Sequence, residues 1–226
     1  MDIANRILYE DNHLIIVNKL AGEIVQGDKT CDEPLVETLK RYLKERYNKP
    51  GNVFCGLVHR IDRPVSGVVV FAKTSKALAR MNELVRERHI SKKYLALVEQ
   101  TPKVEKQHLV GYLFRNEKLN KSFVSHVEKK NYVKAELSYQ VIRKLQHYTL
   151  LEVELYTGRH HQIRAQLAAN GTVIKGDLKY GARRSNRDGS ISLHAYQISF
   201  SHPVTHTSVT VTAPLSGEMA EIVGQL

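Results

Sequence analysis

Alternation of apolar and charged side chains in the second half of the chain most constrains the fold. Leu151, Val153 and Leu155 alternate with two glutamates, which is the period of a strand that turns one face to the core. Other segments rich in β-branched and aromatic residues have the same strand character. We therefore expect strands at residues 7–9, 13–17, 53–58, 68–71, 93–98, 133–142, 149–156, 192–200 and 208–211, with further candidates between 107 and 156.

Three segments instead have the spacing of amphipathic helices. In residues 34–47, apolar side chains recur every four residues from Leu35 to Tyr47. Residues 76–88 and 161–170 show a similar stripe. The first of these three helices keeps a basic face, so we expect one side buried and the other in water.

The helix ends carry suitable capping residues. Thr74 or Ser75 can cap the second helix, and Gly171 supplies a left-handed stop after the third. A short helix near Met219 ends the chain. Strands come in runs with helices between some of them, which predicts an α+β fold with a mixed, mainly antiparallel sheet flanked by helices and loops. At 226 residues the chain fits one large domain or two small lobes, with ample length for a buried core.

The charge balance points to a partner rich in phosphate. Lys+Arg number 34 and Asp+Glu 23, a formal net charge of +11. The basic residues are spread through apolar, strand-like segments, so they indicate a folded surface that touches a backbone at many points. The alternative is a solvated basic surface that only aids solubility.

The sequence lacks the signals that mark several other classes of protein. No secretory leader and no apolar run of membrane-spanning length is present, and two cysteines, Cys31 and Cys55, match no zinc or disulfide pattern. We therefore expect a cytoplasmic protein without a membrane partner. Neither a dinucleotide fingerprint nor a complete phosphate loop occurs.

A metal-dependent hydrolase is a weaker alternative. His59 and Asp62, with His194, could supply ligands, but the arginines beside Asp62 oppose a cation there. His160 and His161 are adjacent at a helix start, where side chains point about a quarter-turn or more apart, so they rarely bind one ion together.

The segment from His59 to Gly67 places one acid between two arginines in a loop. Asp62 lies between Arg60 and Arg63, which favour its ionised form. Loops held by a rigid scaffold often carry working residues. The alternative is an aspartate that only shapes a turn, and on spacing alone this alternative is the stronger of the two.

Two further segments offer companions for Asp62. Tyr94 lies on a predicted strand, but periodicity does not rank it above Tyr139 or Tyr148. Residues 156–164 place arginines, histidines and a glutamine at a turn into a helix, which suits an anion. A polar helix opening that is simply solvated remains the alternative.

Taken together, four ordered blocks resemble the RluA family of RNA pseudouridine synthases over nearly the whole chain. The blocks are Glu10-Asp11 through Asn18-Lys19; His59-Arg60-Ile61-Asp62-Arg63-x-x-Ser66-Gly67 with Phe71-Ala72-Lys73-Thr74; Lys93-Tyr94-Leu95-Ala96-Leu97-Val98; and Thr157-Gly158-Arg159-x-His161-Gln162-Ile163-Arg164 with Gly176-Asp177, Tyr180-Gly181, Leu193-His194-Ala195 and His202-Pro203.

The resemblance implies a pseudouridine synthase fold with a catalytic cleft, and isomerisation of uridine to pseudouridine in structured RNA. It assigns Asp62 as the catalytic carboxylate and Arg164 as its ionic partner. Tyr94 would stack on the target base, Leu193 would give an apolar wall, and Arg60 would fill the gap left by the displaced uridine. No cofactor or metal is implied.

The chain starts directly at the catalytic motifs, so we expect residues 1–226 to be a stand-alone catalytic domain without the amino-terminal S4 module of some relatives. We expect it to act as a monomer on rRNA or tRNA. This sequence departs from the family pattern at Leu20, Pro64-Val65, His160 and Gln166. Pro64 and Gln166 could alter the substrate pocket. The competing hypothesis from another class is a non-catalytic RNA-binding protein on the same scaffold.

Overall fold

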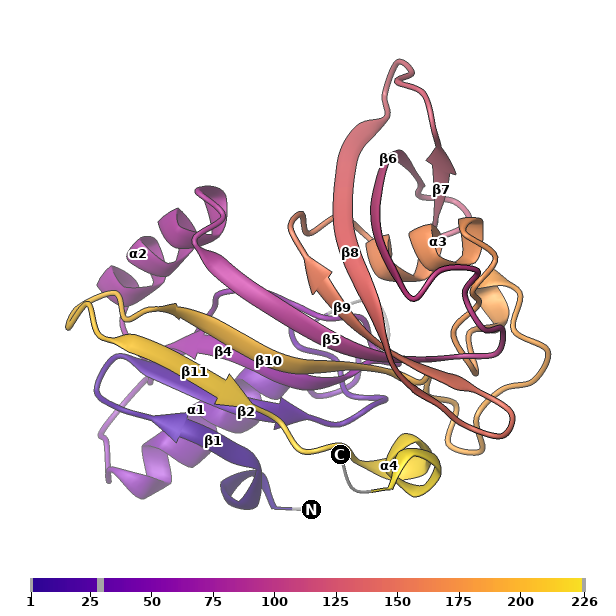
Figure 1. The fold of residues 1–226 in the computed structure, drawn as a ribbon. Coiled ribbons are helices and arrows are strands. Elements are labelled where there is room, and N and C mark those ends of the chain that lie inside the picture. Colours follow the sequence, from indigo (N-terminus) through magenta and orange to yellow (C-terminus); the bar gives the residue numbers. More distant parts are fainter. Residues whose placement is uncertain (1, 28–30, 225–226) are drawn as a thin grey trace. The chain divides into compact units, whose positions relative to one another are not determined.

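The computed structural model describes residues 2–27 and 31–224, and the chain divides into two compact units. Unit 1 comprises the chain up to Ile90 together with Ala195–Pro214. Unit 2 comprises Ser91–His194 and the segment from Leu215 onward. Figure 1 labels most elements of both units.

Unit 1 is built on antiparallel strands. A short 3₁₀ helix, η1 (Ile3–Arg6), precedes them. Strands β1, β2, β4 and β10 follow one another in the sheet, with β3 against β4 and β11 against β10. Every pair whose register is resolved in this unit is antiparallel. The strands are β1 (Ile7–Glu10), β2 (Leu14–Lys19), β3 (Gly56–Leu57), β4 (Ser66–Ala72), β10 (Leu193–Ser201, in this unit from Ala195) and β11 (Ser208–Thr212).

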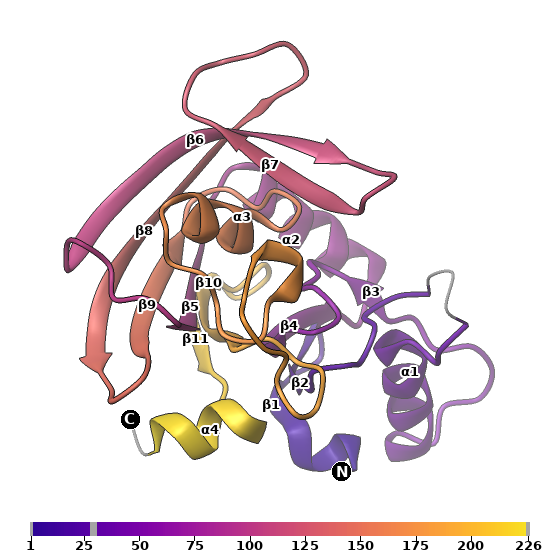
Figure 2. The same cartoon turned by 90° about the vertical axis from the view of Figure 1, so that its right-hand side faces the viewer.

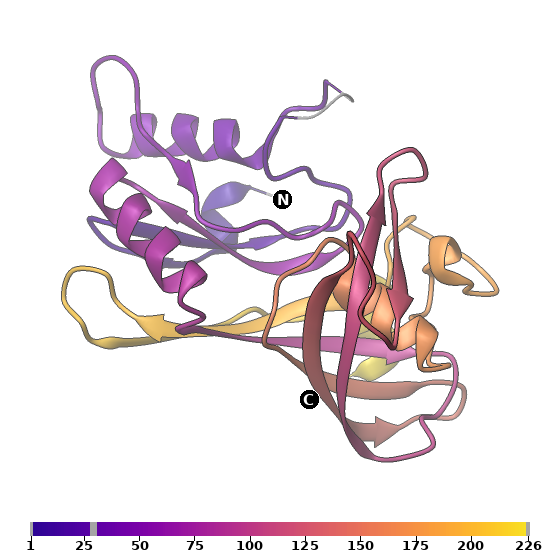
Figure 3. The ribbon, with the colours of Figure 1, turned by 90° about the horizontal axis from the view of Figure 1, so that it is seen from above.

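Two helices complete unit 1, and Figure 3 shows them running alongside its strands. Helix α1 (Leu35–Arg46) begins where the Leu35 N–H donates to the carbonyl of Ile24 at 2.8 Å. Helix α2 (Ser75–Arg86) buries Met81 among apolar residues of β2, β4, β10 and β11. Of the two caps expected for it, Thr74 is the one observed, since its Oγ1 accepts from the Ala77 N–H at 3.1 Å.

Two sequence expectations in unit 1 were wrong. The strand expected at 53–58 is only Gly56–Leu57, because these two residues alone pair in register with the end of β4. Tyr47, expected as the last apolar residue of the first helix, is 46% exposed and caps its end. Its hydroxyl donates to Glu10 Oε1 at 2.7 Å, so Tyr47 bonds to the end of β1 at the surface and does not pack in the core.

Unit 2 has its own antiparallel strands, in the order β5, β9, β8, β6, β7. Figure 2 shows the longer strands curving around helix α3 (Gln162–Ala169). Ala165 of this helix packs with Leu113 and Ala135 of the sheet. The remaining elements are β5 (Ile90–Val98, in this unit from Ser91), β6 (Lys106–Asn116), β7 (Lys121–Ser125), β8 (Val133–Lys144), β9 (Thr149–Leu155), the 3₁₀ helix η2 (Leu178–Tyr180) and α4 (Gly217–Val223).

The other expected elements are confirmed within a few residues at their ends. Gly171 follows α3 with a φ of +78°, the left-handed stop that the sequence indicates. Both cysteines are free thiols, Cys31 exposed and Cys55 buried. Within residues 2–27 and 31–224, no helix is long and apolar enough to cross a membrane, and no cluster of three or more potential ligands could hold a metal ion.

Candidate active site

Asp62 lies in the loop between β3 and β4 of unit 1, and backbone contacts fix this loop on both sides. The carbonyl of Asp62 accepts from the Val65 N–H at 3.0 Å, and the carbonyl of Arg63 accepts from the Gly22 N–H at 2.8 Å. Gly67 closes the loop with a φ of +116°, and a Cβ there would lie 2.3 Å from the Ala195 carbonyl oxygen. Only glycine fits at this point.

The two arginines beside Asp62 differ in their surroundings. Arg63 pairs with Asp32 at 2.7 Å, and both side chains are about half exposed. Arg60 is exposed at the surface of the loop. Arg63 therefore has a surface partner, and the two arginines that flank Asp62 lie in different surroundings.

Lys19, near Asp62, was part of a recognised block, but no role was expected for it. It is fully buried at the end of β2, and its Nζ donates to the carbonyls of Leu20 (2.8 Å) and Arg63 (3.1 Å). Burial lowers the pKa of Lys19 from 10.5 to about 7, against the opposing pull of the Glu23 and Asp62 carboxylates. A lysine at the polar end of an apolar strand was the available signal.

Unit 2 carries the other candidate residues. Tyr94 on β5 is buried and lies opposite Val153 of β9 in the register. Leu193, the first residue of β10, is also buried. Of the two tyrosines that competed with Tyr94 in the sequence, Tyr139 is a core residue whose hydroxyl donates to Gln107 Oε1 at 2.9 Å. Tyr148 lies with its ring 5.7 Å from the Lys175 ammonium.

Arg164 forms a buried, two-point ion pair with Asp177. Its Nε donates to Oδ2 at 2.7 Å and its Nη2 to Oδ1 at 2.8 Å, and the two side chains are 5% and 1% exposed. The guanidinium also lies 5.2 Å from the centre of the Tyr180 ring. Asp177 was part of a recognised block, but no role was expected for it. The predicted pairing of Arg164 with Asp62, a residue of unit 1, stays a prediction.

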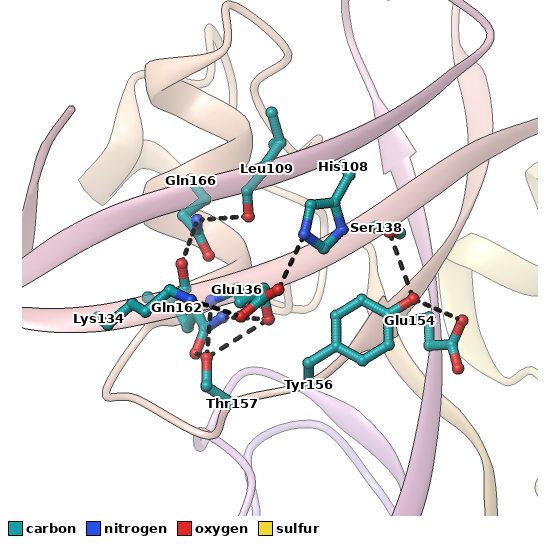
Figure 4. Close-up of polar contacts among 11 residues, drawn as sticks. His108, Leu109, Lys134, Glu136, Ser138, Glu154, Tyr156, Thr157, Gln162 and Gln166 are labelled. Atoms are coloured by element: carbon teal, nitrogen blue, oxygen red, sulfur yellow. Dashed lines mark hydrogen bonds and ion pairs between the residues drawn. The ribbon is translucent and has the colours of Figure 1, made fainter.

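The turn that leads into α3 is held by a network of amide and hydroxyl groups, drawn in Figure 4. Thr157 Oγ1 donates to Gln162 Oε1 at 2.8 Å, and the Arg159 N–H donates to the same oxygen at 3.0 Å. Gln162 Nε2 donates to the Glu136 carbonyl at 3.1 Å, which ties the turn to β8. The polar helix opening is therefore an ordered structure.

The prediction for the adjacent histidines was wrong. The rings of His160 and His161 stack, with centroids 3.8 Å apart and planes at 19°. The reason is that His161 adopts a left-handed backbone (φ +52°) before the helix begins, so helical side-chain directions do not apply. Burial, followed by nearby cations of which Arg164 is the foremost, lowers the pKa of His161 to about 2, and the ring is neutral.

Gln166 lies on the buried side of α3. Its Nε2 is 3.4 Å from the carbonyls of Leu109 and Ala135, on strands β6 and β8 (Figure 4). These long contacts connect the helix to the sheet. The expected influence of Gln166 and Pro64 on the substrate pocket stays a prediction.

Comparison with known proteins shows to which class of protein the chain belongs, that of the RNA-modifying isomerases. Residues 13–169 match the RNA pseudouridylate synthase family. The chain is 33% identical to ribosomal large subunit pseudouridine synthase C of Buchnera aphidicola subsp. Acyrthosiphon pisum, over 95% of this chain and 68% of that protein. It is 32% identical to the uncharacterized RNA pseudouridine synthase YlyB of Bacillus subtilis, over 97% and 72%. The chain belongs to the RNA pseudouridylate synthase family, and its activity is that of an RNA pseudouridine synthase.

Solved structures agree on the fold. The structure of human RNA pseudouridylate synthase domain containing 4 aligns with a TM-score of 0.82 at 23% identity, over 98% of this chain and 92% of that one. The predicted α+β pseudouridine synthase fold is confirmed.

We predict that Lys19→Met removes a pH dependence of stability. The unfolded chain binds the Lys19 proton up to about pH 10, whereas the folded chain loses it near pH 7. Between these values the unfolding free energy of the wild type therefore rises with pH, by up to about 1.4 kcal/mol per unit. Urea titrations from pH 7 to 10 measure it. Lys19→Met should lack this rise of the unfolding free energy with pH, whereas Lys76→Met, at an exposed position of α2, should keep it. Equal slopes in all three proteins would contradict a lowered pKa of Lys19.

We also predict that Asp177→Asn lowers the unfolding free energy by about 3 kcal/mol, because a buried arginine loses a charged partner. The matched control is Glu105→Gln, which removes the carboxylate of the exposed pair with Lys144. The control should leave the urea midpoint unchanged. Equal midpoints for Asp177→Asn and wild type would show that the buried pair contributes nothing to stability.

Proposed function

We propose that this chain isomerises specific uridines in large-subunit ribosomal RNA, with Asp62 as the catalytic carboxylate. The observation that carries the proposal is the family match over residues 13–169, which contains the blocks of Asp62, Tyr94 and Arg164. Support for the ribosomal substrate comes from relatives, since those of Buchnera aphidicola and Pasteurella multocida are ribosomal large subunit pseudouridine synthases. A tRNA substrate is the alternative.

In this reaction the bond between the base nitrogen and the sugar breaks, the base turns over, and a ring carbon bonds to the sugar in its place. The proton on that carbon leaves to solvent and the freed base nitrogen takes up a proton, so the product is an isomer of the substrate. Asp62 can attack the sugar, add to the base or abstract the proton, and each step requires an ionised carboxylate. The loop contacts of Gly22 and Lys19 to the Arg63 carbonyl hold the backbone beside Asp62 in position.

We propose that the residues assigned by family resemblance act around this acid as one catalytic domain over residues 1–226. Tyr94 stacks on the uracil, Leu193 gives the base an apolar wall, and Arg164 balances the charge of Asp62. Arg60 fills the space of the displaced uridine, which offsets part of an unstacking cost of a few kcal/mol. The surface pair of Arg63 with Asp32 supports this division, because it leaves Arg60 as the loop arginine for the RNA.

The partners follow from the same proposal. RNA is the sole macromolecular partner required, and the net charge of +11 suits its backbone. The chain acts as a monomer in the cytoplasm, without a metal or nucleotide cofactor. The isomerisation has no net consumption of a co-substrate, so nothing else need be supplied.

We predict that Asp62→Asn binds RNA with wild-type affinity but forms pseudouridine at least about a thousandfold more slowly, because it lacks the charged oxygen that the chemistry requires. Product is measured by nucleoside mass spectrometry after cyanoethylation of the RNA. The matched control, Asp32→Asn, removes a nearby exposed carboxylate and should keep full activity.

Near-wild-type turnover in Asp62→Asn would overturn the assignment of Asp62. Wild-type protein that binds large-subunit rRNA and forms no pseudouridine would instead support the non-catalytic RNA-binding alternative. Pseudouridine formed in tRNA but not in rRNA would move the substrate and leave the catalytic residue in place.

A further inference from the structure

Three aromatic side chains form a cluster on strands β6 and β7 and the turn before β8, all in unit 2. Phe114 and Phe123 lie opposite each other in the register of β6 and β7. The ring of Tyr132 stacks on Phe114 with centroids 5.4 Å apart and planes at 28°. Phe123 is 39% exposed. Three apolar rings thus lie together where a strand pair meets solvent.

This cluster lies on the sheet face away from α3. Leu113, the residue before Phe114, is buried against Ala135 and Ala165 of α3. Since side chains alternate along a strand, Phe114 points to the opposite face. Tyr94 lies opposite Val153, and Val153 opposite Tyr139, a row of buried side chains. The exposed cluster is therefore a surface feature separate from the position that Tyr94 occupies.

Lysines flank the rings at both ends. The Lys121 ammonium lies 5.9 Å from the centre of the Phe123 ring, and the Lys129 ammonium lies 5.9 Å from that of Tyr132. Residues 115–134 contain six basic residues (Arg115, Lys118, Lys121, Lys129, Lys130 and Lys134) against two acidic ones (Glu117 and Glu128), a net charge of +4. The surface combines ring faces with positive charge.

That combination fits unpaired RNA better than other ligands. Base rings stack on aromatic side chains, and each nucleotide carries a phosphate for the neighbouring lysines. Helical RNA presents phosphates but hides its base faces, so it would leave the rings unused. A protein partner of matching charge would have to be acidic, and it would gain less from the row of rings.

We propose that Phe114, Phe123 and Tyr132 form a stacking platform for unpaired nucleotides of the RNA substrate that lie outside the target uridine. Lys121 and Lys129 neutralise the adjoining phosphates. This inference rests on the proposed function, because the RNA that the platform binds is the substrate of the isomerisation. It adds a requirement for the substrate: an unpaired segment in addition to the target uridine.

The experiment measures binding of a fluorescently labelled oligoribonucleotide of adenosine and cytidine to the full chain by anisotropy. This RNA contains no uridine, so it is not a substrate, and it is compared with its duplex. We expect Phe123→Ser with Tyr132→Ser to weaken binding of the single strand about tenfold or more. Duplex binding should change less than about twofold. The matched control is Phe54→Ser, which removes an exposed aromatic ring of unit 1.

A second measurement tests the lysines through the salt dependence of binding. Lys121→Gln and Lys129→Gln should each reduce the slope of log affinity against log salt for the single strand by about 0.7. Lys76→Gln on α2 should leave that slope unchanged. Equal urea midpoints confirm that each variant is folded, and Phe123→Ser alone carries the test if the double variant does not fold.

Unchanged single-strand affinity in the folded aromatic variants would overturn the platform. Equal losses for the single strand and the duplex would also overturn it, because they indicate a backbone contact without stacking. Neither result bears on Asp62, whose test is product formation. Conversely, a failure of Asp62→Asn to stop turnover would leave these binding results intact.

Discussion

The buried ion pair between Arg164 and Asp177 is the interaction on which the organisation of unit 2 depends most. Removing two charges from water costs several kcal/mol per ion, and the cost is offset only by good geometry and further hydrogen bonds. Here both conditions hold, since the pair is joined at two points of 2.7 and 2.8 Å. The pair fixes the guanidinium of α3 against the segment before η2, so this arginine has a defined position before any RNA binds.

The backbone around Asp177 is equally constrained. Its carbonyl accepts from the N–H groups of Tyr180 and Ala182, both at 3.0 Å. Gly176 beside it has a φ of +86°, and a Cβ there would lie 2.6 Å from Asn186 Oδ1. In unit 1 the Asp62 loop is held similarly, by Lys19 and by Gly67. Asp62 and Asp177 thus both lie on irregular segments that polar contacts and closely packed glycines hold in place, which suits residues that must be positioned in advance.

Much of the fold could be predicted because it follows from local periodicity. Alternation gave β9, and the four-residue repeat gave α1, since both patterns depend on which face of an element is buried. The errors lie where tertiary contacts decide. Residues 53–58 are apolar, but only Gly56 and Leu57 pair in register with β4, and the Tyr47 hydroxyl bonds to Glu10. Residue spacing could not predict the left-handed backbone of His161, because a histidine rarely adopts this conformation and no local pattern indicates it.

The candidate site, like the fold, could be predicted only in part. Asp62 could be singled out by its flanking arginines, but the alternative of a turn residue was overcome only by the family resemblance. Neither the Arg164–Asp177 pair nor the depressed pKa of Lys19 could be predicted, because each depends on contacts between segments distant in sequence or on burial. The aromatic platform also depends on register between strands, which a list of residues does not reveal.

The most direct test of the central claim is tritium release from large-subunit rRNA labelled at carbon 5 of uridine, with purified protein in EDTA and no added nucleotide. An enzyme that isomerises uridine with its own side chains should release one tritium for each pseudouridine found in the same RNA. Absence of release, or release that requires a metal ion or a nucleotide, would contradict the account.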